Sequence, residues 1–299
     1  MNAIMDMAVA GAFMALLGVG LALLLAVANR RLYVFEDPRI EQVEELLPKS
    51  NCGACGTAGC RNFAEGLVEG KLQPVQCTVN APEMNAYIAG LLGVALGEQE
   101  KRVARLACAG GRHVAFMRAR YDGVETCRAA AIVGGGGKGC AWGCLGLGDC
   151  ETVCDFDAIW LDDNGLPQVI ADKCTACGDC VEVCPKDLFS LQPVSRHLWV
   201  ACKNLADPDL AEADCEVACT ACGKCVMDAV PSLIVLKDNL AVIDYSRNEL
   251  ATTKAIERCP TGAIVWLDDG RGPIKGPAAK KILRQQPLPL MSVHSGGRE

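Results

Sequence analysis

The sequence has few of the residues from which most enzyme sites are built. Its 299 residues include only three histidines (His113, His197 and His294), and none stands near another candidate ligand. No pairing of a nucleophile with a base and no flavin motif is present. The glycine run at 134–139 lacks the serine or threonine that a phosphate-binding loop needs after its lysine, because Gly139 occupies that position. The sequence therefore predicts no catalytic site of its own.

A surplus of basic charge and a secretion signal are also absent. The formal net charge is −7, which argues against nucleic acid as a partner. The chain contains 20 cysteines but no cleavable signal peptide, so an extracellular disulfide framework explains them poorly. In a reducing compartment, thiols clustered at short spacing indicate metal ligands.

Residues 1–31 contain a long apolar run. Met7 to Ala28 carries no polar or charged side chain. As a helix it extends about 33 Å at about 1.5 Å per residue, enough for a hydrocarbon core of about 30 Å. Asp6 precedes the run, where a signal peptide has positive charge, and Arg30 and Arg31 follow it. By the positive-inside bias we expect a single-pass anchor in the cell inner membrane, with the later domains in the cytoplasm.

A small helical module is predicted at residues 32–95. Glycines between its cysteines free the backbone to fold around a metal cluster and to aim N–H groups at the sulfurs. A zinc site is the alternative, although zinc sites usually pair their cysteines two and two. We expect one [4Fe-4S] cluster, bound by Cys52, Cys55, Cys60 and Cys77.

A two-cluster ferredoxin-like domain is predicted at residues 96–200. A stretched cysteine run precedes a strand–turn–strand hairpin, and a complete C-x2-C-x2-C-x3-C-P run ending at Pro185 follows it. In bacterial ferredoxins the last cysteine of each run ligates the cluster of the other run. One expected cluster is therefore bound by Cys140, Cys144, Cys150 and Cys184. The other is bound by Cys154, Cys174, Cys177 and Cys180.

Residues 201–270 repeat this plan with one cluster lost. A C-x2-C-x2-C run is followed by a second hairpin pattern and a Cys-Pro pair. The four positions that would serve one cluster hold Ala229, Glu249, Thr252 and Ala255. The four that serve its neighbour remain, namely Cys219, Cys222, Cys225 and Cys259.

Four cysteines are left over, which is the number that a fifth cluster requires. They are Cys108, Cys127, Cys202 and Cys215. The alternative is that they are buried free thiols, which behave as small hydrophobic side chains. Spacing does not decide which of them exchanges roles with Cys140 or Cys144. We thus predict four [4Fe-4S] clusters and a fifth from these residues.

The predicted fold class is α+β: a transmembrane helix, a small helical iron–sulfur module and tandem bacterial-ferredoxin-like domains. Residues 271–299 contain proline and glycine with an excess of lysine and arginine. They are predicted to form a disordered basic tail. Contact of this tail with the anionic membrane surface is an alternative role.

The anchor, the Cys52-x2-Cys55-x4-Cys60…Cys77 module and the ferredoxin pair, in this order, resemble the B subunit of the Rnf complexes. These are membrane-bound, ion-translocating ferredoxin:NAD oxidoreductases. The resemblance covers residues 1 to about 266, and GCLGLGDC at 143–150 is similar to the longer members of the family. The chain departs from the family pattern at 249–255, where longer members usually carry a second complete ferredoxin pair.

The resemblance implies an electron-transfer component of a translocase, with no catalysis of its own beyond electron transfer. It would relay electrons between soluble ferredoxin or flavodoxin and the flavin- and NAD-linked membrane and peripheral subunits of an Rnf-type complex. An iron–sulfur subunit of another membrane enzyme, such as a quinone reductase or a hydrogenase, is the alternative. A zinc-binding scaffold is a third class.

Overall fold

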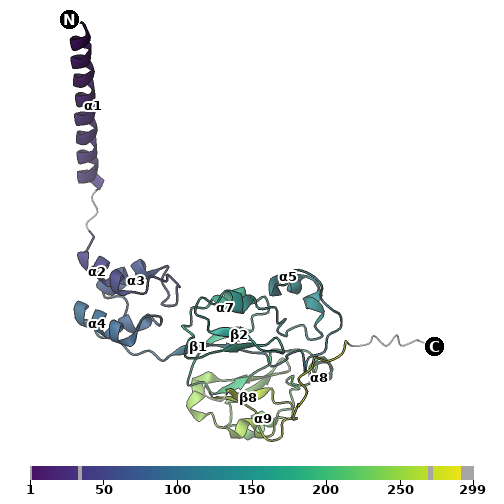
Figure 1. Cartoon of the computed structure of the whole chain (residues 1–299). Coiled ribbons are helices and arrows are strands. Elements are labelled where there is room, and N and C mark those ends of the chain that lie inside the picture. Colours follow the sequence, from purple (N-terminus) through teal and green to yellow (C-terminus); the bar gives the residue numbers. More distant parts are fainter. Residues whose placement is uncertain (1, 33–35, 269–271, 291–299) are drawn as a thin grey trace.

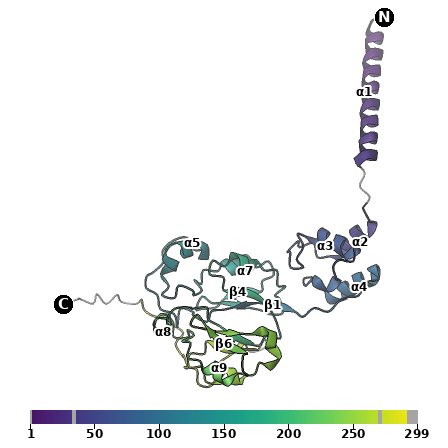
Figure 2. The ribbon, with the colours of Figure 1, turned by 180° about the vertical axis from the view of Figure 1, so that it is seen from behind.

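A long apolar helix stands apart from the rest of the molecule. The computed structural model describes residues 2–32, 36–268 and 272–290. Helix α1 (Asn2–Leu32) extends away from the other domains in both views (Figures 1 and 2). Among the described residues, Met7–Leu32 is the one stretch long and apolar enough to cross a membrane, and its side chains are not buried in the protein. The predicted anchor therefore has the length and composition of a membrane span.

The N-terminal module consists of short helices around a small apolar core. Its elements are α2 (Pro38–Leu46), α3 (Cys60–Val68), the 3-10 turn η1 (Pro74–Gln76) and α4 (Pro82–Leu92). Asp37 caps α2 by accepting a hydrogen bond from the backbone N–H of Arg39, and Pro38 occupies the first helical position. Val43, Phe63 and Ile88 form the buried centre. Packing of α2 against α3, and of α4 against α2 and η1, thus holds the loop that carries the first cysteines.

The first ferredoxin-like lobe is built from two antiparallel strand pairs. Strand β1 (Arg102–Leu106) pairs with β4 (Phe189–Pro193), and between them in the sequence β2 (Ile159–Leu161) pairs with β3 (Pro167–Val169). Short helices between the strands carry cysteines. They are α5 (Cys127–Ile132), α6 (Asp149–Thr152) and α7 (Asp179–Val183), with the turn η2 (Gly134–Gly137) after α5.

The second lobe repeats this plan. Strand β5 (Leu198–Val200) pairs with β8 (Ile264–Asp268), and β6 (Ile234–Lys237) pairs with β7 (Leu240–Ile243) between them. Strand β9 (Gly272–Ile274) extends the sheet beside β8. The helical elements are α8 (Pro208–Asp214), α9 (Lys224–Asp228), η3 (Tyr245–Leu250) and α10 (Lys254–Glu257). Both views show this lobe stacked against the first (Figures 1 and 2).

Two hydrogen bonds join the lobes close to the strand ends. The indole N–H of Trp199 donates to the carbonyl of Leu106 at 2.9 Å, and the backbone N–H of Ala109 donates to the carbonyl of Ala201 at 3.0 Å. These contacts hold the segments after β1 and β5 side by side. Each of those segments carries one of the cysteines that the spacing left unassigned.

The segment after β9 is ordered where the structure describes it. The sequence predicted a disordered tail at 271–299, but residues 272–290 run over the surface of both lobes. Backbone N–H groups of Ala278 and Leu288 donate to the carbonyls of Glu257 and Arg112. Arg284 forms a salt bridge with Glu216 at 2.5 Å. Residues 291–299 lie outside the described part of the chain.

Apolar packing fills the region of the second lobe from which four cysteines are missing. Ala255 and Ile256 are 1 % and 3 % exposed and pack with Leu233 and Ile243 in one core, against which Ala229 also lies. Glu249 and Thr252, at the other two positions, are exposed. The lobe therefore keeps a continuous core without a metal cluster at this place.

Ile256→Ala should lower the free energy of unfolding of the second lobe by about 2–5 kcal/mol, as is typical for a large apolar side chain removed from a filled core. Urea unfolding followed by the fluorescence of Trp199 and Trp266 measures the change. Val242→Ala is the matched control, because Val242 is 40 % exposed in the same lobe and should change stability by no more than about 0.5 kcal/mol. An equal loss of unfolding free energy in both variants would show that the side chains around Ile256 do not form the core of the lobe.

Candidate metal centres

Sixteen of the twenty cysteines lie in four groups of four, and the other four belong to the N-terminal module; the sets are named by their places in the fold. In the N-terminal set, Cys55, Cys60 and Cys77 pack around one core, and Cys52 precedes Cys55 by three residues. The outer set comprises Cys154, Cys174, Cys177 and Cys180. The inner set comprises Cys127, Cys144, Cys150 and Cys184. The junction set comprises Cys108, Cys140, Cys202 and Cys215. The second-lobe set comprises Cys219, Cys222, Cys225 and Cys259.

Four of these sets surround pockets of nearly equal size. The empty space, including the open mouth, is about 370 Å³ at the second-lobe set and 340 Å³ at the junction set. It is about 320 Å³ at the outer set and 330 Å³ at the inner set. Small and apolar residues form most of the remaining lining. The same arrangement therefore recurs four times in two lobes of one fold.

The spacing of the thiols fits a cluster of several metal atoms better than a single ion. Within the described ranges, no group of three or more histidine, cysteine, aspartate or glutamate side chains lies close enough to hold one metal ion. A zinc site brings its four ligands within about 2.3 Å of a single point. Four cysteines around a shared pocket instead suit the corners of an iron–sulfur cubane. Each of the four pockets thus has the set of ligands that one such cluster requires.

In the N-terminal set, local backbone geometry brings the cysteines together. Gly53 and Gly56 have φ values of 72° and 84°, in the left-handed region that glycine adopts at little cost. The side chain of Asn51 accepts a hydrogen bond from the backbone N–H of Cys60 at 2.8 Å, which fixes the start of α3. The buried Asn85 donates to the carbonyl of Cys77 at 3.0 Å. Cys77 is thereby held beside the loop although it comes seventeen residues later.

The outer set has the membership that the ferredoxin crossover predicts. Cys154 lies with the three cysteines of the complete run, across the β2–β3 hairpin. Backbone N–H groups of Ala104 and Ala158 donate to the sulfurs of Cys174 and Cys154, each at 3.4 Å. Such N–H···S bonds stabilise negative charge on the sulfurs and are typical of the surroundings of an iron–sulfur cluster.

The inner set differs from the expectation at one position. The crossover predicted Cys140 beside Cys144, Cys150 and Cys184, whereas the structure has Cys127 there. The carboxylate of Asp149, next to Cys150, accepts hydrogen bonds from the backbone N–H groups of Cys127 and Arg128 at 2.8 and 3.1 Å. This contact ties the start of α5 to α6 over about twenty residues. Cysteine spacing carries no signal of it.

Cys140 belongs instead to the junction set. It lies in one pocket with Cys108 after β1, Cys202 after β5 and Cys215 after α8. Three of the four unassigned cysteines are therefore together, as a fifth cluster requires, and Cys140 completes the group. Two lobes contribute to it, since β1 belongs to the first and β5 and α8 to the second.

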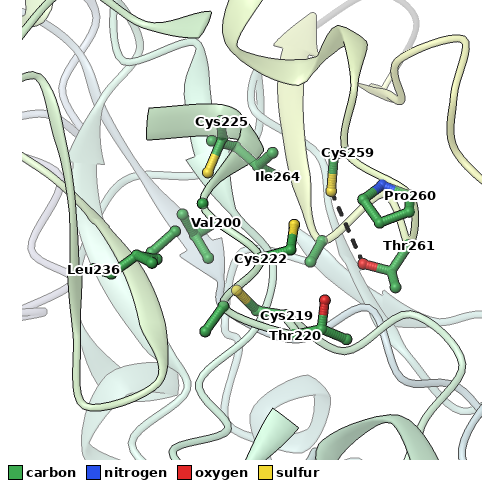
Figure 3. A pocket seen from close by; sticks show the side chains of 14 residues that line it. Val200, Cys219, Thr220, Cys222, Cys225, Leu236, Cys259, Pro260, Thr261 and Ile264 are labelled. Carbon is green, nitrogen blue, oxygen red and sulfur yellow. Dashed lines mark hydrogen bonds between the residues drawn. The ribbon is translucent and has the colours of Figure 1, made fainter. Parts of the chain in front are cut away.

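The second-lobe set joins residues that are far apart in sequence. Figure 3 shows Cys219, Cys222 and Cys225 on the loop and first turn of α9, with Cys259 facing them from the turn before Pro260. Gly223 has a φ of 73°, which lets the loop turn into the helix between these cysteines. The hydroxyl of Thr261 lies 3.9 Å from the sulfur of Cys259. The structure brings together the four cysteines that the sequence predicts to remain as ligands in the second ferredoxin-like repeat.

Burial makes these thiols weak acids in the absence of metal. It raises the pKa of Cys150 and Cys180 in the first lobe to about 12, and does the same for Cys202 and Cys225 in the second. Neighbouring thiols raise these pKa values further. Because only thiolates bind metal, occupation of the sites has to displace these protons.

Two family models of iron–sulfur proteins match parts of the chain. A family model described as a putative Fe-S cluster matches residues 47–79, and one described as a 4Fe-4S dicluster domain matches residues 141–191. These ranges contain the N-terminal set and seven of the eight cysteines of the outer and inner sets.

Curated relatives align over most of the chain. The B subunit of the Na(+)-translocating ferredoxin:NAD(+) oxidoreductase complex of Acetobacterium woodii is 39 % identical over 88 % of this chain and 78 % of its own length. The B subunit of the ion-translocating oxidoreductase complex of Methanosarcina acetivorans is 34 % identical over 85 % and 96 %. The B subunit of the proton-translocating ferredoxin:NAD(+) oxidoreductase complex of Clostridium ljungdahlii is 35 % identical over 86 % and 91 %.

The exchange of Cys127 and Cys140 can be tested with double variants. Cys150→Ala combined with Cys127→Ala should lose no more iron than Cys150→Ala alone, because both remove the same cluster. Cys150→Ala combined with Cys140→Ala should lose about twice as much, since each single loss is about one to four iron atoms. Iron and acid-labile sulfide per chain give the measurement. If the Cys127→Ala double variant instead loses about twice as much iron and the Cys140→Ala double variant loses no more than Cys150→Ala alone, Cys140 is the ligand that the crossover rule predicts.

Proposed function

Because this chain belongs to the B-subunit family of ion-translocating oxidoreductase complexes, we propose that it relays electrons through five [4Fe-4S] clusters. The relay joins a soluble carrier such as ferredoxin or flavodoxin to membrane and peripheral subunits of an Rnf-type complex. Bound clusters supply one-electron redox chemistry. The residues of this chain hold the clusters, insulate them and bring them near one another. The observation that carries this proposal is that contacts near or within the cysteine sets link them in a single series.

The first link joins the N-terminal module to the outer set. Thr78 follows Cys77, and Thr175 follows Cys174. The hydroxyl of Thr78 donates to the carbonyl of Thr175 at 2.5 Å, although the two residues are 97 positions apart. The loops that carry the two sets therefore touch, which supports electron transfer between the module nearest the anchor and the first lobe.

The second link joins the outer and inner sets inside the first lobe. Cys180 of the outer set and Cys150 of the inner set belong to one buried core, which also contains Ala104, Ile159 and Phe189. The two sets are therefore joined through packed, buried side chains, and this arrangement supports direct electron transfer between them.

The last two links run through the junction set. The backbone N–H of Cys144, in the inner set, donates to the sulfur of Cys108 at 3.4 Å. The backbone N–H of Cys219, in the second-lobe set, donates to the sulfur of Cys202, also at 3.4 Å. In each case a residue of one set is hydrogen-bonded directly to a sulfur of the next. The junction set is therefore the connection between the lobes.

The two ends of the series suit different partners. Cys222 is exposed, whereas every other cysteine is buried or half-buried. The second-lobe set is therefore the best placed to exchange electrons with a soluble carrier. The N-terminal set lies in the module next to α1, close to where membrane subunits would meet the chain. We infer that α1 spans the membrane and that Arg30 and Arg31 hold the later domains on the cytoplasmic side.

Deletion of residues 1–31 should release the protein from membranes with its clusters in place. The reason is that Met7–Leu32 is the one candidate span in the described chain and makes no buried contact with the other domains. Sedimentation after a high-salt wash and iron content per chain give the measurement. A truncated form that still sediments with membranes would contradict a single anchor.

Cys215→Ala should interrupt the relay in the middle. With reduced ferredoxin as donor, the second-lobe set should be reduced as in the unchanged chain, while the inner, outer and N-terminal sets are reduced much more slowly. Freeze-quench electron paramagnetic resonance follows each signal. Dithionite serves as the control, because it reaches all sets directly. Fast reduction of the N-terminal set in this variant would overturn the proposed order. Co-purification with a quinone reductase or hydrogenase would instead favour the alternative membrane enzyme.

A further inference from the structure

A lysine side chain lies between the junction and inner sets. Lys138 lines the pocket of the junction set and is half-buried. Its ammonium group donates hydrogen bonds to the carbonyls of Gly110 and Cys144 at 2.6 and 2.5 Å. A Cβ on Gly143 would lie 3.0 Å from the Lys138 side chain, so glycine at this position leaves room for it. The positive charge is thus held at a defined place beside the sulfurs.

The junction set also receives an unusual number of hydrogen bonds. Backbone N–H groups of Gly110 and Cys144 donate to the sulfur of Cys108, each at 3.4 Å. Those of Asn204 and Cys219 donate to the sulfur of Cys202, at 3.5 and 3.4 Å. The side-chain amide of Asn204, which is 1 % exposed, lies 3.6 Å from the sulfur of Cys140 as a donor. Five N–H groups therefore point at three sulfurs.

The neighbouring inner set is similarly buried but has fewer donors. Cys150 of the inner set is 9 % exposed, and Cys140 and Cys215 of the junction set are 8 % and 6 % exposed. The other five cysteines of the two sets are half-buried, so burial opposes added negative charge to a similar degree at both sets. Among the side-chain and backbone contacts of the described residues, the inner set has one N–H···S bond of this kind at 3.5 Å or less, from Leu188 to Cys184. Each of the two pockets is lined by one half-buried lysine, Lys138 at the junction set and Lys186 at the inner set, so the difference between the sets lies in the number of N–H donors.

Both features stabilise the reduced state more than the oxidised state. Reduction adds one negative charge to the cluster and its thiolates, and a nearby cation or N–H dipole interacts more favourably with the larger charge. In a site screened from water this interaction is stronger than at the surface. Hydrogen bonds to sulfur, net charge and solvent exposure are the variables that set iron–sulfur potentials.

We propose that Lys138 and Asn204 raise the reduction potential of the junction set, and that its larger number of N–H donors places this potential above that of the inner set, so that electrons accumulate at the connection between the lobes. The inference rests on the proposed function only in requiring a cluster at this set. In the exchange, one electron leaves a neighbouring set and one arrives at the junction set. No proton or group moves. Lys138 and Asn204 are positioning residues for charge and take no electron themselves.

A redox titration of the full chain tests this, with electron paramagnetic resonance as the readout and dithionite and mediators in place of a protein partner. The signal lost in Cys215→Ala identifies the junction set, and this signal should have a higher midpoint than the one lost in Cys150→Ala. Lys138→Met keeps the length of the side chain and removes its charge. At a fixed potential it should lower the ratio of reduced to oxidised junction set by about tenfold, which is about 59 mV for a one-electron couple.

Three variants separate charge from structure. Lys138→Arg should leave the midpoint nearly unchanged, because it retains the cation. Asn204→Leu should move the same midpoint in the negative direction by a smaller amount. Lys101→Met is the control, because Lys101 is a surface lysine of the same lobe that pairs with Asp172 and lines none of the four pockets.

Several outcomes would overturn the proposal. They are an unchanged midpoint in Lys138→Met with full iron content, an equal shift in Lys138→Arg, and the loss of no signal in Cys215→Ala. If Lys138→Met loses iron, Asn204→Leu decides alone, and its midpoint must move negative. If reduced ferredoxin did not reduce the clusters, the proposed function would be contradicted, but the shift in the midpoint potential of the junction set would still be measurable with dithionite. The two failures are therefore distinguishable.

Discussion

The close contact of four cysteines at the junction set is the constraint on which the two-lobed structure depends. These cysteines come from segments that follow β1, β5 and α8 and from the loop before Gly143. Bringing them around one pocket requires the ends of β1 and β5 to lie side by side, and the Trp199 and Ala109 hydrogen bonds hold them there. A cluster bound at this site would cross-link the lobes as well as connect their electron paths. The contacts that join the two lobes are thus also the contacts that would join the proposed electron paths.

The C-terminal segment strengthens the same region. Ile282 packs against the core that contains Cys215, Val114 and Val217. Arg284 donates to the carbonyl of His113 at 2.9 Å and forms its salt bridge with Glu216, the residue after Cys215. The exposed ion pair contributes little stability by itself, but it fixes the path of the segment over the junction set. A stretch whose composition suggests disorder is ordered here because tertiary contacts supply the partners.

Sequence patterns predicted the parts of the site that depend on residues close together in the sequence. Helix α1 follows from an uninterrupted apolar run, and the grouping of the three cysteines in each C-x2-C-x2-C run follows from their short spacing. The outer and second-lobe groupings were predicted as well, because the ferredoxin plan relates each run to one distant cysteine. The exchange of Cys127 and Cys140 could not be predicted in this way. It depends on Asp149 holding the start of α5 and on Cys140 facing the other lobe, and neither contact leaves a periodic or spaced pattern.

The loss of one cluster from the second lobe is explained by where that cluster would lie. In the first lobe the inner set contacts the junction set, and the outer set lies beyond it toward the N-terminal module. By the repeat, Cys219, Cys222, Cys225 and Cys259 correspond to the inner set, and Ala229, Glu249, Thr252 and Ala255 correspond to the outer set. The missing cluster is therefore the one farther from the junction set, at the end of the series. In the proposed series, the apolar core that replaces it removes the last site and leaves the set that contains the exposed Cys222 as the terminal one.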